Sequence, residues 1–187
     1  MFGRIGRGAL LACRVAAAGL PLWAAAAAAE LHYAPRENLE SVDAALIDDS
    51  ETSIDMAAYV LSDQRVIAAL IDAADRGVVI RLYLDKGQYA QHDPLRGGLI
   101  EKLLGYSNVF ARVKGRGVLM HLKAYVVDHR VLRTGSGNFS RQGLADQDND
   151  LIEVREPDAI LAFEANFDAI FARGANVEAM GRTLRMR

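Results

Sequence analysis

The hydrophobic and polar positions of the chain follow two different periods along its length. Residues 54–61 and 78–85 are short, mostly apolar runs, and such runs predict buried strands. Between them, apolar side chains recur at helical spacing from about residue 62 to Gly77, a residue type that commonly ends helices. A strand, a helix and a strand in this order predict a βαβ unit with parallel strands and a right-handed crossover.

The rest of the pattern extends this α/β arrangement over most of the chain. Further strands are expected at residues 31–34, 108–113, 121–128, 131–134 and 150–154, and helices at residues 38–48, 93–104 and 157–173. Residues 86–93 are polar and predict a loop at the C-terminal end of a strand, where open α/β sheets commonly bind ligands. With 187 residues and 51% hydrophobic composition, one domain with a proper core is expected.

Residues 1–29 have the pattern of a secretory signal peptide. Arg4, Arg7 and Arg14 form a basic start, and an uncharged apolar run of 15 residues ends in three alanines before Glu30. A membrane span needs about 20 apolar residues, so an uncleaved anchor is the second interpretation. Both interpretations predict an exported protein, periplasmic or secreted, with its domain at residues 30–174 and a basic, flexible tail at residues 175–187.

Charge and cysteine usage narrow the functional classes. Cys13 is the only cysteine and lies in the N-terminal segment, so the remainder of the chain can form no disulfide. Loss of the three N-terminal arginines changes the formal net charge from −2 to −5, which is unfavourable for nucleic-acid binding. Between Arg112 and Arg141, however, seven basic residues accompany one acidic residue. This basic rim would attract a polyanionic substrate or an anionic membrane surface.

The candidate chemistry is concentrated in residues 121–138. His121 and Lys123 are two apart, so on a strand both point to one face. Asp128 closes that strand, and a tight turn at the next two residues would return the chain and deliver Ser136 and Asn138 to the same end of the sheet. Imidazole can act as nucleophile, acid or base, while the ammonium and the neutral donors suit phosphate oxygens. The cluster therefore favours attack on a phosphodiester.

The pattern H-x-K-x4-D followed by G-S-x-N resembles the signature motif of the phospholipase D superfamily. The stretches T-S-I-D-M-A-A-Y, A-A-D-R-G-V-V-I-R-L-Y-L-D and Q-D-N-D-L-I-E-V are similar to its small, single-motif nuclease branch, so the resemblance covers residues 31–174. It implies an α/β fold with a mixed, largely parallel sheet flanked by helices on both faces. It also implies a two-step reaction, in which one histidine forms a phosphohistidine and a second protonates the leaving oxygen and then activates water.

The implied reaction needs two histidines, and the chain carries one copy of the motif. General acid–base assistance is typically worth about 10²- to 10⁴-fold, so a site with one histidine would be badly impaired. A homodimer in which the two copies of His121 meet across the two-fold axis is the economical solution, and the resemblance implies the same. In this scheme the catalytic residues are His121, Lys123 and Asp128, and Asp128 takes part less directly by fixing the strand end and neighbouring basic groups. The phosphate is bound by Lys123, Ser136 and Asn138.

The superfamily also places a carboxylate behind the catalytic histidine, and here the chain departs from the pattern. An ungapped register puts Asn149 at that position, flanked by Asp148 and Asp150, and one of these two aspartates is expected to serve. No constellation of His, Cys, Asp or Glu along the sequence suggests a metal site, and the implied mechanism requires neither metal nor cofactor.

Three functional hypotheses follow. The first is a metal-independent phosphodiesterase acting as an exported, homodimeric endonuclease on DNA or RNA. The second is a phospholipase D that cleaves phospholipid headgroups, because the motif binds the phosphodiester and ignores what is attached to it. The third is an inactive nucleic-acid- or lipid-binding module, although none of the six motif positions is missing.

Overall fold

The computed structural model describes residues 29–91, 98–115 and 117–179. The predicted signal peptide therefore lies outside the described residues, except for Ala29. The strands are β1 (Ala29–Ala34), β2 (Ser53–Ala58), β3 (Val79–Leu84), β4 (Val109–Val113), β5 (Lys123–Val127), β6 (Val131–Thr134), β7 (Asn149–Val154) and β8 (Val177–Ala179). The helices are α1 (Leu39–Asp48), α2 (Gln64–Asp75), α3 (Lys86–Gln91), α4 (Leu99–Leu103), α5 (Pro157–Phe171) and the π-helical turn η2 (Gln142–Asp146).

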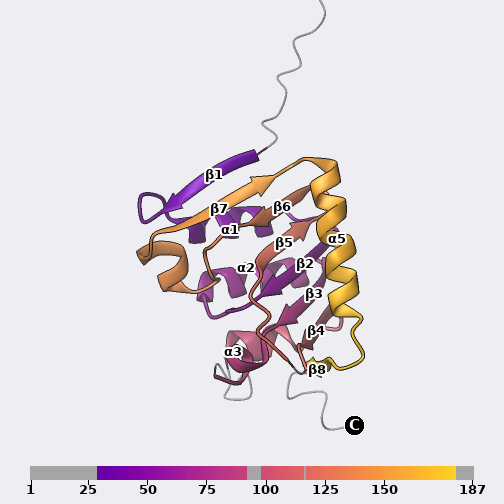
Figure 1. The fold of residues 1–187 in the computed structure, drawn as a ribbon. Coiled ribbons are helices and arrows are strands. Elements are labelled where there is room, and N and C mark those ends of the chain that lie inside the picture. Colours follow the sequence, from indigo (N-terminus) through magenta and orange to yellow (C-terminus); the bar gives the residue numbers. More distant parts are fainter. Residues whose placement is uncertain (1–28, 92–97, 116, 180–187) are drawn as a thin grey trace, which may run out of the picture.

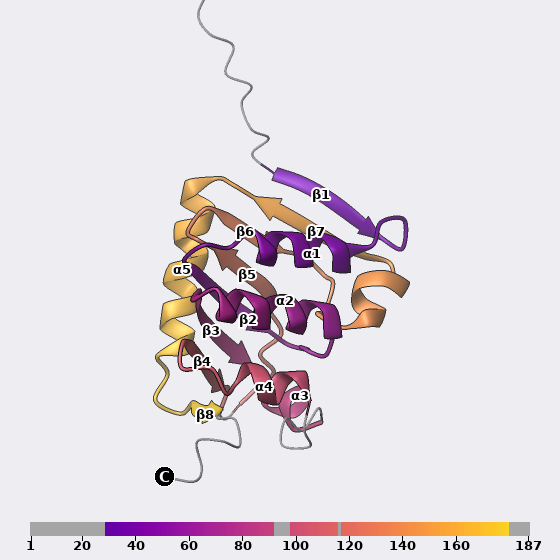
Figure 2. The ribbon, with the colours of Figure 1, turned by 180° about the vertical axis from the view of Figure 1, so that it is seen from behind.

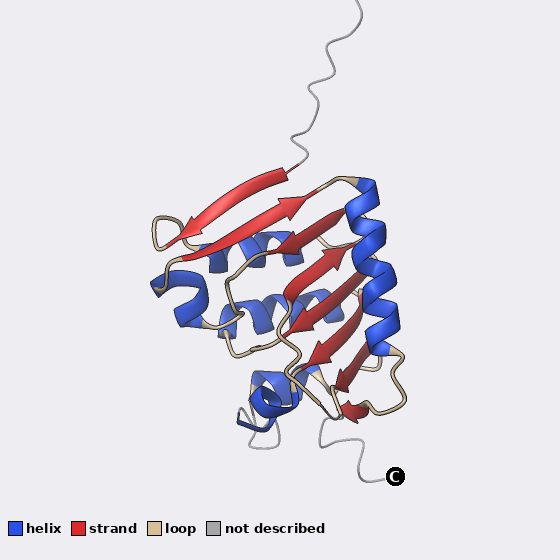
Figure 3. Ribbon diagram, in the orientation of Figure 1, coloured by secondary structure: helices blue, strands red, loops and turns tan. Residues whose placement is uncertain are grey.

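One mixed sheet joins the eight described strands in the order β1-β7-β6-β5-β2-β3-β4-β8 (Figure 3). The predicted βαβ unit is confirmed, because β2 and β3 are parallel neighbours joined through α2. The expectation of a largely parallel sheet is wrong. Only the β2–β3 and β3–β4 pairings are parallel, and the other five among the described strands are antiparallel. Short connections such as the one between β5 and β6 leave no room for a crossover, so they impose antiparallel pairing.

Helices cover both faces of the sheet, as expected. α5 crosses one face, whereas α1 and α2 lie on the other (Figures 1 and 2). Successive residues of β2 serve the two layers: Met56 belongs to the main core cluster with α1 and α2, and Ala57 packs in the cluster that contains Phe167 of α5. Burial on both faces explains why the central strands read as continuous apolar runs.

Local signals in the sequence place the two N-terminal helices. The Asn38 side chain accepts a hydrogen bond from the Glu40 N–H at the start of α1, and Asp63 accepts from the N–H groups of Arg65 and Val66 at the start of α2. Asn and Asp are both residue types that are favoured at helix N-caps. In the described ranges, no helix has both the length and the apolar character needed to cross a bilayer.

Two further segments differ from the sequence-based expectation. Residues 86–91, expected as a loop, form α3, whose first turn is capped by the side chain of Asp85. Residues 177–179 fall in the expected flexible tail but form β8, which pairs with β4 and covers its edge. Neither capping by a residue that ends a strand nor pairing with a distant strand is visible in local periodicity. Residues 180–187, Arg116 and the start of the helix expected from residue 93 lie outside the described residues.

Candidate active site

A tight hairpin brings the two halves of the motif together. Asp128 and His129 have φ values of 50° and 57°, and this left-handed pair reverses the chain between β5 and β6. The antiparallel register pairs Tyr125 with Arg133, so the residues that follow β6 return to the end at which β5 begins. The prediction that the G-S-x-N segment reaches the H-x-K end of the sheet is confirmed.

His121 and Lys123 form the centre of this end of the sheet. The Lys123 Nζ lies 3.1 Å from the His121 Nδ1 and donates to the His121 carbonyl oxygen at 2.7 Å. Lys123 is 7% exposed, whereas His121 is open to solvent. Burial lowers the pKa of Lys123 from its ordinary value. An ammonium donates and does not accept, so with Lys123 charged the His121 Nδ1 is the acceptor and Nε2 carries the ring proton.

Tyr59, just beyond β2, packs against both of these residues. Its ring centroid lies 4.5 Å from that of His121 and 4.9 Å from the Lys123 Nζ, and its N–H donates to the Leu122 carbonyl at 2.8 Å. An aromatic face near an ammonium is favourable and restricts its position. Tyr59 is a site residue that the sequence analysis did not identify, although it lies in one of the stretches that carried the resemblance.

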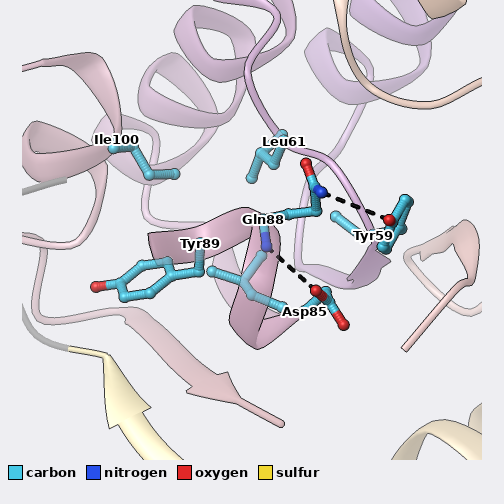
Figure 4. A pocket seen from close by; sticks show the side chains of 8 residues that line it. Tyr59, Leu61, Asp85, Gln88, Tyr89 and Ile100 are labelled. Atoms are coloured by element: carbon cyan, nitrogen blue, oxygen red, sulfur yellow. Dashed lines mark hydrogen bonds between the residues drawn. The ribbon is translucent and has the colours of Figure 1, made fainter. Parts of the chain in front are cut away.

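Asp85, at the end of β3, fixes the backbone that leads into the motif. Its buried carboxylate accepts from the Met120 N–H at 3.0 Å through one oxygen and from the Gly87 and Gln88 N–H groups through the other. Figure 4 shows Asp85 beside a cavity of about 20 Å³, where the Gln88 side chain donates to the Tyr59 hydroxyl at 3.4 Å. α3 is thereby connected to the residue that precedes His121.

Arg133 connects the backbone segments of the two motif halves. Its guanidinium is fully buried and forms a bidentate ion pair with Asp43 of α1, with nitrogen–oxygen distances of 2.8 and 2.9 Å. The same group donates to the carbonyl oxygens of Lys123 and Gly137 at 2.9 and 3.3 Å. One buried cation therefore holds both backbone segments, and Tyr125 joins the network through a hydrogen bond to Asp43. The sequence alone places Arg133 only among the seven basic residues of the basic rim.

Asn138 and Ser136 differ in how far their polar atoms are already occupied. The Asn138 Oδ1 is buried and has no hydrogen-bond partner among the described residues. The Ser136 hydroxyl donates to the Asn149 Oδ1 and accepts from the Asp150 N–H, both at 3.0 Å. A buried amide oxygen without a partner is costly, and functional sites are where such atoms are retained. The Asn138 Oδ1 can therefore accept a hydrogen bond from a donor group of a ligand, while Ser136 stabilises its own loop.

Asp128 lies at the opposite end of β5 from His121. Its carboxylate accepts from the backbone N–H groups of Glu51, Thr52 and Ser53, from the Thr52 hydroxyl and from Arg130. Burial raises the pKa of Asp128, but the hydrogen bonds from Ser53, Glu51 and Thr52 outweigh it and hold the pKa well below its usual range. The part of the prediction that gave Asp128 a strand-end role agrees with this geometry, and no described contact joins it to His121.

The two candidate supporting aspartates are not at the histidine ring. Asp150 accepts from the Ser136 N–H at 3.1 Å, and hydrogen bonding to Ser136 lowers the pKa of Asp150. Asp148 is exposed, and neither carboxylate hydrogen-bonds to His121 in the described residues. Asn149, at the position expected from the register, uses its amide to bind the Gly143 carbonyl and Ser136. A carboxylate was expected to orient the His121 ring, but here the Nδ1 atom of that ring contacts the Lys123 ammonium.

Comparison with known proteins identifies the family. Residues 44–171 match the family model described as "Cardiolipin synthase, PLD-like domain", which is more than half of the chain. The chain belongs to the phospholipase D superfamily. A phospholipase D from Rickettsia bellii is 33% identical over 102 residues, covering 50% of this chain and 44% of that protein. A mitochondrial cardiolipin hydrolase from Chlamydomonas reinhardtii is 23% identical over 119 residues, covering 64% and 51%. The chain thus spans about half the length of these relatives.

Solved structures of the superfamily share the fold. NucT from Helicobacter pylori has a TM-score of 0.72 at 19% identity, covering 81% of this chain and 98% of that one. The phospholipase D family member Nuc from Salmonella typhimurium has a TM-score of 0.68 at 20% identity, covering 81% and 97%. At these identities the similarity establishes the fold alone, and the match extends over nearly the full length of both neighbours.

The basic rim of this superfamily member is smaller than its sequence indicates. Arg133 and Lys123 are buried, Arg112 donates to the Phe171 carbonyl beneath α5, and Arg130 is paired with Asp128. Of the seven cations counted from the sequence, only Lys114 and Arg141 are described and engage neither a carboxylate nor the core, while Arg116 lies outside the described residues. Long-range attraction of a polyanion therefore has fewer sources than the count suggests.

Proposed function

We propose that this chain is a metal-independent phosphodiesterase that works through a phosphohistidine, and that it acts as a homodimeric endonuclease after export. The observation that carries the proposal is the pairing of the His121 ring with the Lys123 ammonium, at the end of the sheet to which the segment that carries Asn138 returns. A nucleophile, a fixed cation and a neutral amide are the groups that attack on a phosphodiester requires. The relatives described as phospholipases D and the nuclease-type neighbours support the class of bond.

The reaction divides into two displacements at phosphorus. The His121 Nε2 of one subunit attacks, forming a nitrogen–phosphorus bond, while the bond to the leaving oxygen breaks and His121 of the other subunit donates a proton to that oxygen. The second imidazole then takes a proton from water, whose oxygen displaces the first imidazole and restores both rings. The Lys123 ammonium and the side-chain N–H groups of Asn138 donate hydrogen bonds to the non-bridging oxygens in both steps. The acid role requires a proton on Nε2 of the second His121, whereas attack requires the tautomer of the first His121 in which the ring proton has moved to Nδ1 and Nε2 carries the lone pair.

The homodimer is supported by what surrounds His121. His129 lies at the other end of β5 and His32 in β1 at the sheet edge, so among the described residues no second histidine of the same chain stands at the site. Val118, Leu119 and Leu122 are 84%, 59% and 39% exposed immediately beside His121. An apolar patch at a catalytic residue favours burial against another surface, and in this proposal the surface is the second subunit.

The same patch favours the alternative substrate. Val118 and Leu119 provide an exposed apolar tip close to His121 along the chain. If the tip inserts into a lipid surface, the chain is a phospholipase D acting on headgroups, as the names of its relatives suggest.

A paired substrate assay separates the two functions. Purified protein is incubated in EDTA with plasmid DNA, and in parallel with vesicles of phosphatidylcholine or of cardiolipin. Cleavage of DNA with intact lipid is the expected result, and cleavage of lipid alone would reverse the assignment. Turnover of neither substrate, with binding to one, would favour the inactive binding module. Export is tested by N-terminal sequencing of the protein from the periplasm or medium, which is expected to begin at Glu30.

A further inference from the structure

Three potential metal ligands converge on the sheet edge formed by β1 and β7. Glu30 and His32 alternate along β1 and therefore share a face, and Glu30 is the direct partner of Glu153 in the antiparallel register. One ligand atom from each of the three residues lies within 4.8 Å of the other two. The sequence showed no such constellation, because β7 brings Glu153 to this edge from the far half of the chain.

The hydrogen bonds around His32 leave one ring nitrogen aimed into this cluster. The His32 Nδ1 is bonded to the Glu37 carboxylate at 2.8 Å, which makes Nδ1 the donor and leaves a lone pair on Nε2. The Nε2 atom is buried and has no hydrogen-bond partner in the part of the chain that the structure describes. It faces the Oε1 atoms of Glu153 and Glu30 at 3.5 and 3.8 Å. Glu153 has a side chain only 8% exposed, and this Oε1 makes no hydrogen bond in the described residues.

These separations fit a shared cation better than a shared proton. A direct hydrogen bond would bring Nε2 to about 2.7–3.2 Å from an oxygen. Two ligands bound at about 2.1 Å in a tetrahedral site lie about 3.4 Å apart, close to the observed spacing. A histidine whose second nitrogen is held by a carboxylate is also the usual arrangement behind a metal ligand, and Glu37 provides it.

The charge balance points the same way. Three carboxylates, from Glu30, Glu37 and Glu153, surround one imidazole, and Arg155 is the one arginine or lysine that the described residues pair with any of them, through the other oxygen of Glu153. A half-buried group of carboxylates is unfavourable without compensating positive charge.

We infer that Glu30, His32 and Glu153 bind a divalent transition-metal ion of the Zn²⁺ type, with the fourth position open to water. One nitrogen and two carboxylate oxygens suit Zn²⁺ and its neighbours and are a poor set for Ca²⁺. The ion joins β1 to β7, so it stabilises the N-terminal edge strand, whose Leu31 and Tyr33 are half exposed. This site is separate from the proposed catalytic one, since β1 and β7 lie beyond β6 from the strand that carries Lys123.

The site is tested by titrating the EDTA-stripped, re-buffered full chain with Zn²⁺ in a calorimeter, and with Co²⁺ in a spectrometer. One Zn²⁺ per chain and the visible absorption of four-coordinate Co²⁺ are expected, with a rise in the unfolding temperature on Zn²⁺ addition. His32→Asn is expected to abolish all three effects. Glu30→Gln, which changes an exposed side chain remote from the core, is expected to weaken the affinity for Zn²⁺ at least ~10-fold. Glu37→Gln should weaken affinity ~10- to 100-fold.

Glu40→Gln in α1 is the matched control, because it removes the same charge near the same edge without touching the cluster, and it should bind Zn²⁺ as the wild type does. Absence of Zn²⁺ binding, or binding unchanged in both His32→Asn and Glu30→Gln, would overturn the site. Its readouts are affinity, absorption and unfolding temperature, so they stand whatever substrate the chain cleaves. Conversely, catalytic activity that persists in EDTA would not contradict the metal site, because the site is separate from the proposed catalytic one.

Discussion

The two ends of strand β5 carry different parts of one motif, and these two parts have opposite roles. At the start, the partners of the Lys123 ammonium among the described residues are the His121 ring and carbonyl, and the buried Asn138 Oδ1 has no hydrogen-bond partner among them. At the end, the Asp128 carboxylate is saturated by the backbone of residues 51–53 and by Arg130. Polar groups with spare capacity can bind a ligand, whereas saturated ones stabilise the fold. One sequence motif thus combines a reactive end with a structural end.

The largest test of this division is the loss of the nucleophile. His121→Ala should reduce turnover by on the order of 10³-fold or more, with the unfolding transition unchanged, because His121 is exposed and contributes little to packing. His129→Ala is the matched control at the other end of β5: its ring is exposed and paired with Glu164, so activity should be retained. Comparable loss of activity in both variants would contradict the division.

Subunit mixing tests whether the reactive end is shared across a two-fold axis. An equimolar mixture of His121→Ala and Lys123→Ala chains should stay far below wild-type activity, because no pairing supplies two histidines and two lysines. Excess His121→Ala chains should also inhibit wild-type protein as subunits exchange. Full recovery in the first mixture, or no inhibition in the second after exchange is verified by mass, would rule out a shared site.

The structural end predicts a stability effect instead. Asp128→Asn should lower the free energy of unfolding by about 2–4 kcal/mol, because it removes the charge that accepts several backbone hydrogen bonds. Activity of the folded variant at 25 °C should change little. Urea unfolding and the kinetic assay on the same preparation check this, and a stable but inactive variant would return Asp128 to the catalytic group.

The pKa of Asp128 gives this prediction a pH dependence. The folded-state pKa lies below the unfolded one, so the stabilisation is present above about pH 4 and is lost as the pH falls through the folded pKa. The difference in unfolding free energy between wild type and Asp128→Asn should therefore shrink below about pH 4. A difference that stays constant down to about pH 2 would show that the charge of Asp128 is not responsible.

The smallest expected effect concerns the aromatic support of the reactive end. Tyr59→Ala should lower kcat by about 10-fold, because the His121 ring and the Lys123 ammonium lose the face that positions them. Tyr59→Phe should be close to wild type, since the hydrogen bond that the hydroxyl makes in the described residues is a long one, 3.4 Å from the Gln88 side chain. A larger loss in Tyr59→Phe than in Tyr59→Ala would indicate a role for the hydroxyl and would contradict a positioning role for the ring.

Local features of the chain were predictable from residue type and spacing. The tight turn after β5 and the caps at Asn38 and Asp63 depend on residues within a few positions of one another. The sheet was predicted as mixed, but its parallel share was overestimated, because one clear βαβ unit was extended to strands that pair antiparallel. Of these, β5 and β6 are joined by a tight turn, and β6 and β7 by a longer connection that contains η2. The supporting carboxylate was expected from register alone, and the structure directs Asp150 to Ser136 instead.

By itself, the sequence determined the motif, the face that His121 and Lys123 share and the return of Asn138 to them, because strand period and turn chemistry are local properties. Only the tertiary structure decided that Arg133 joins both motif halves through Asp43, and that His32 meets Glu153 at the sheet edge. These partners are far apart along the chain, and strand order brings them together. Periodicity assigns a side chain to a face, whereas its partner on that face depends on which strands become neighbours.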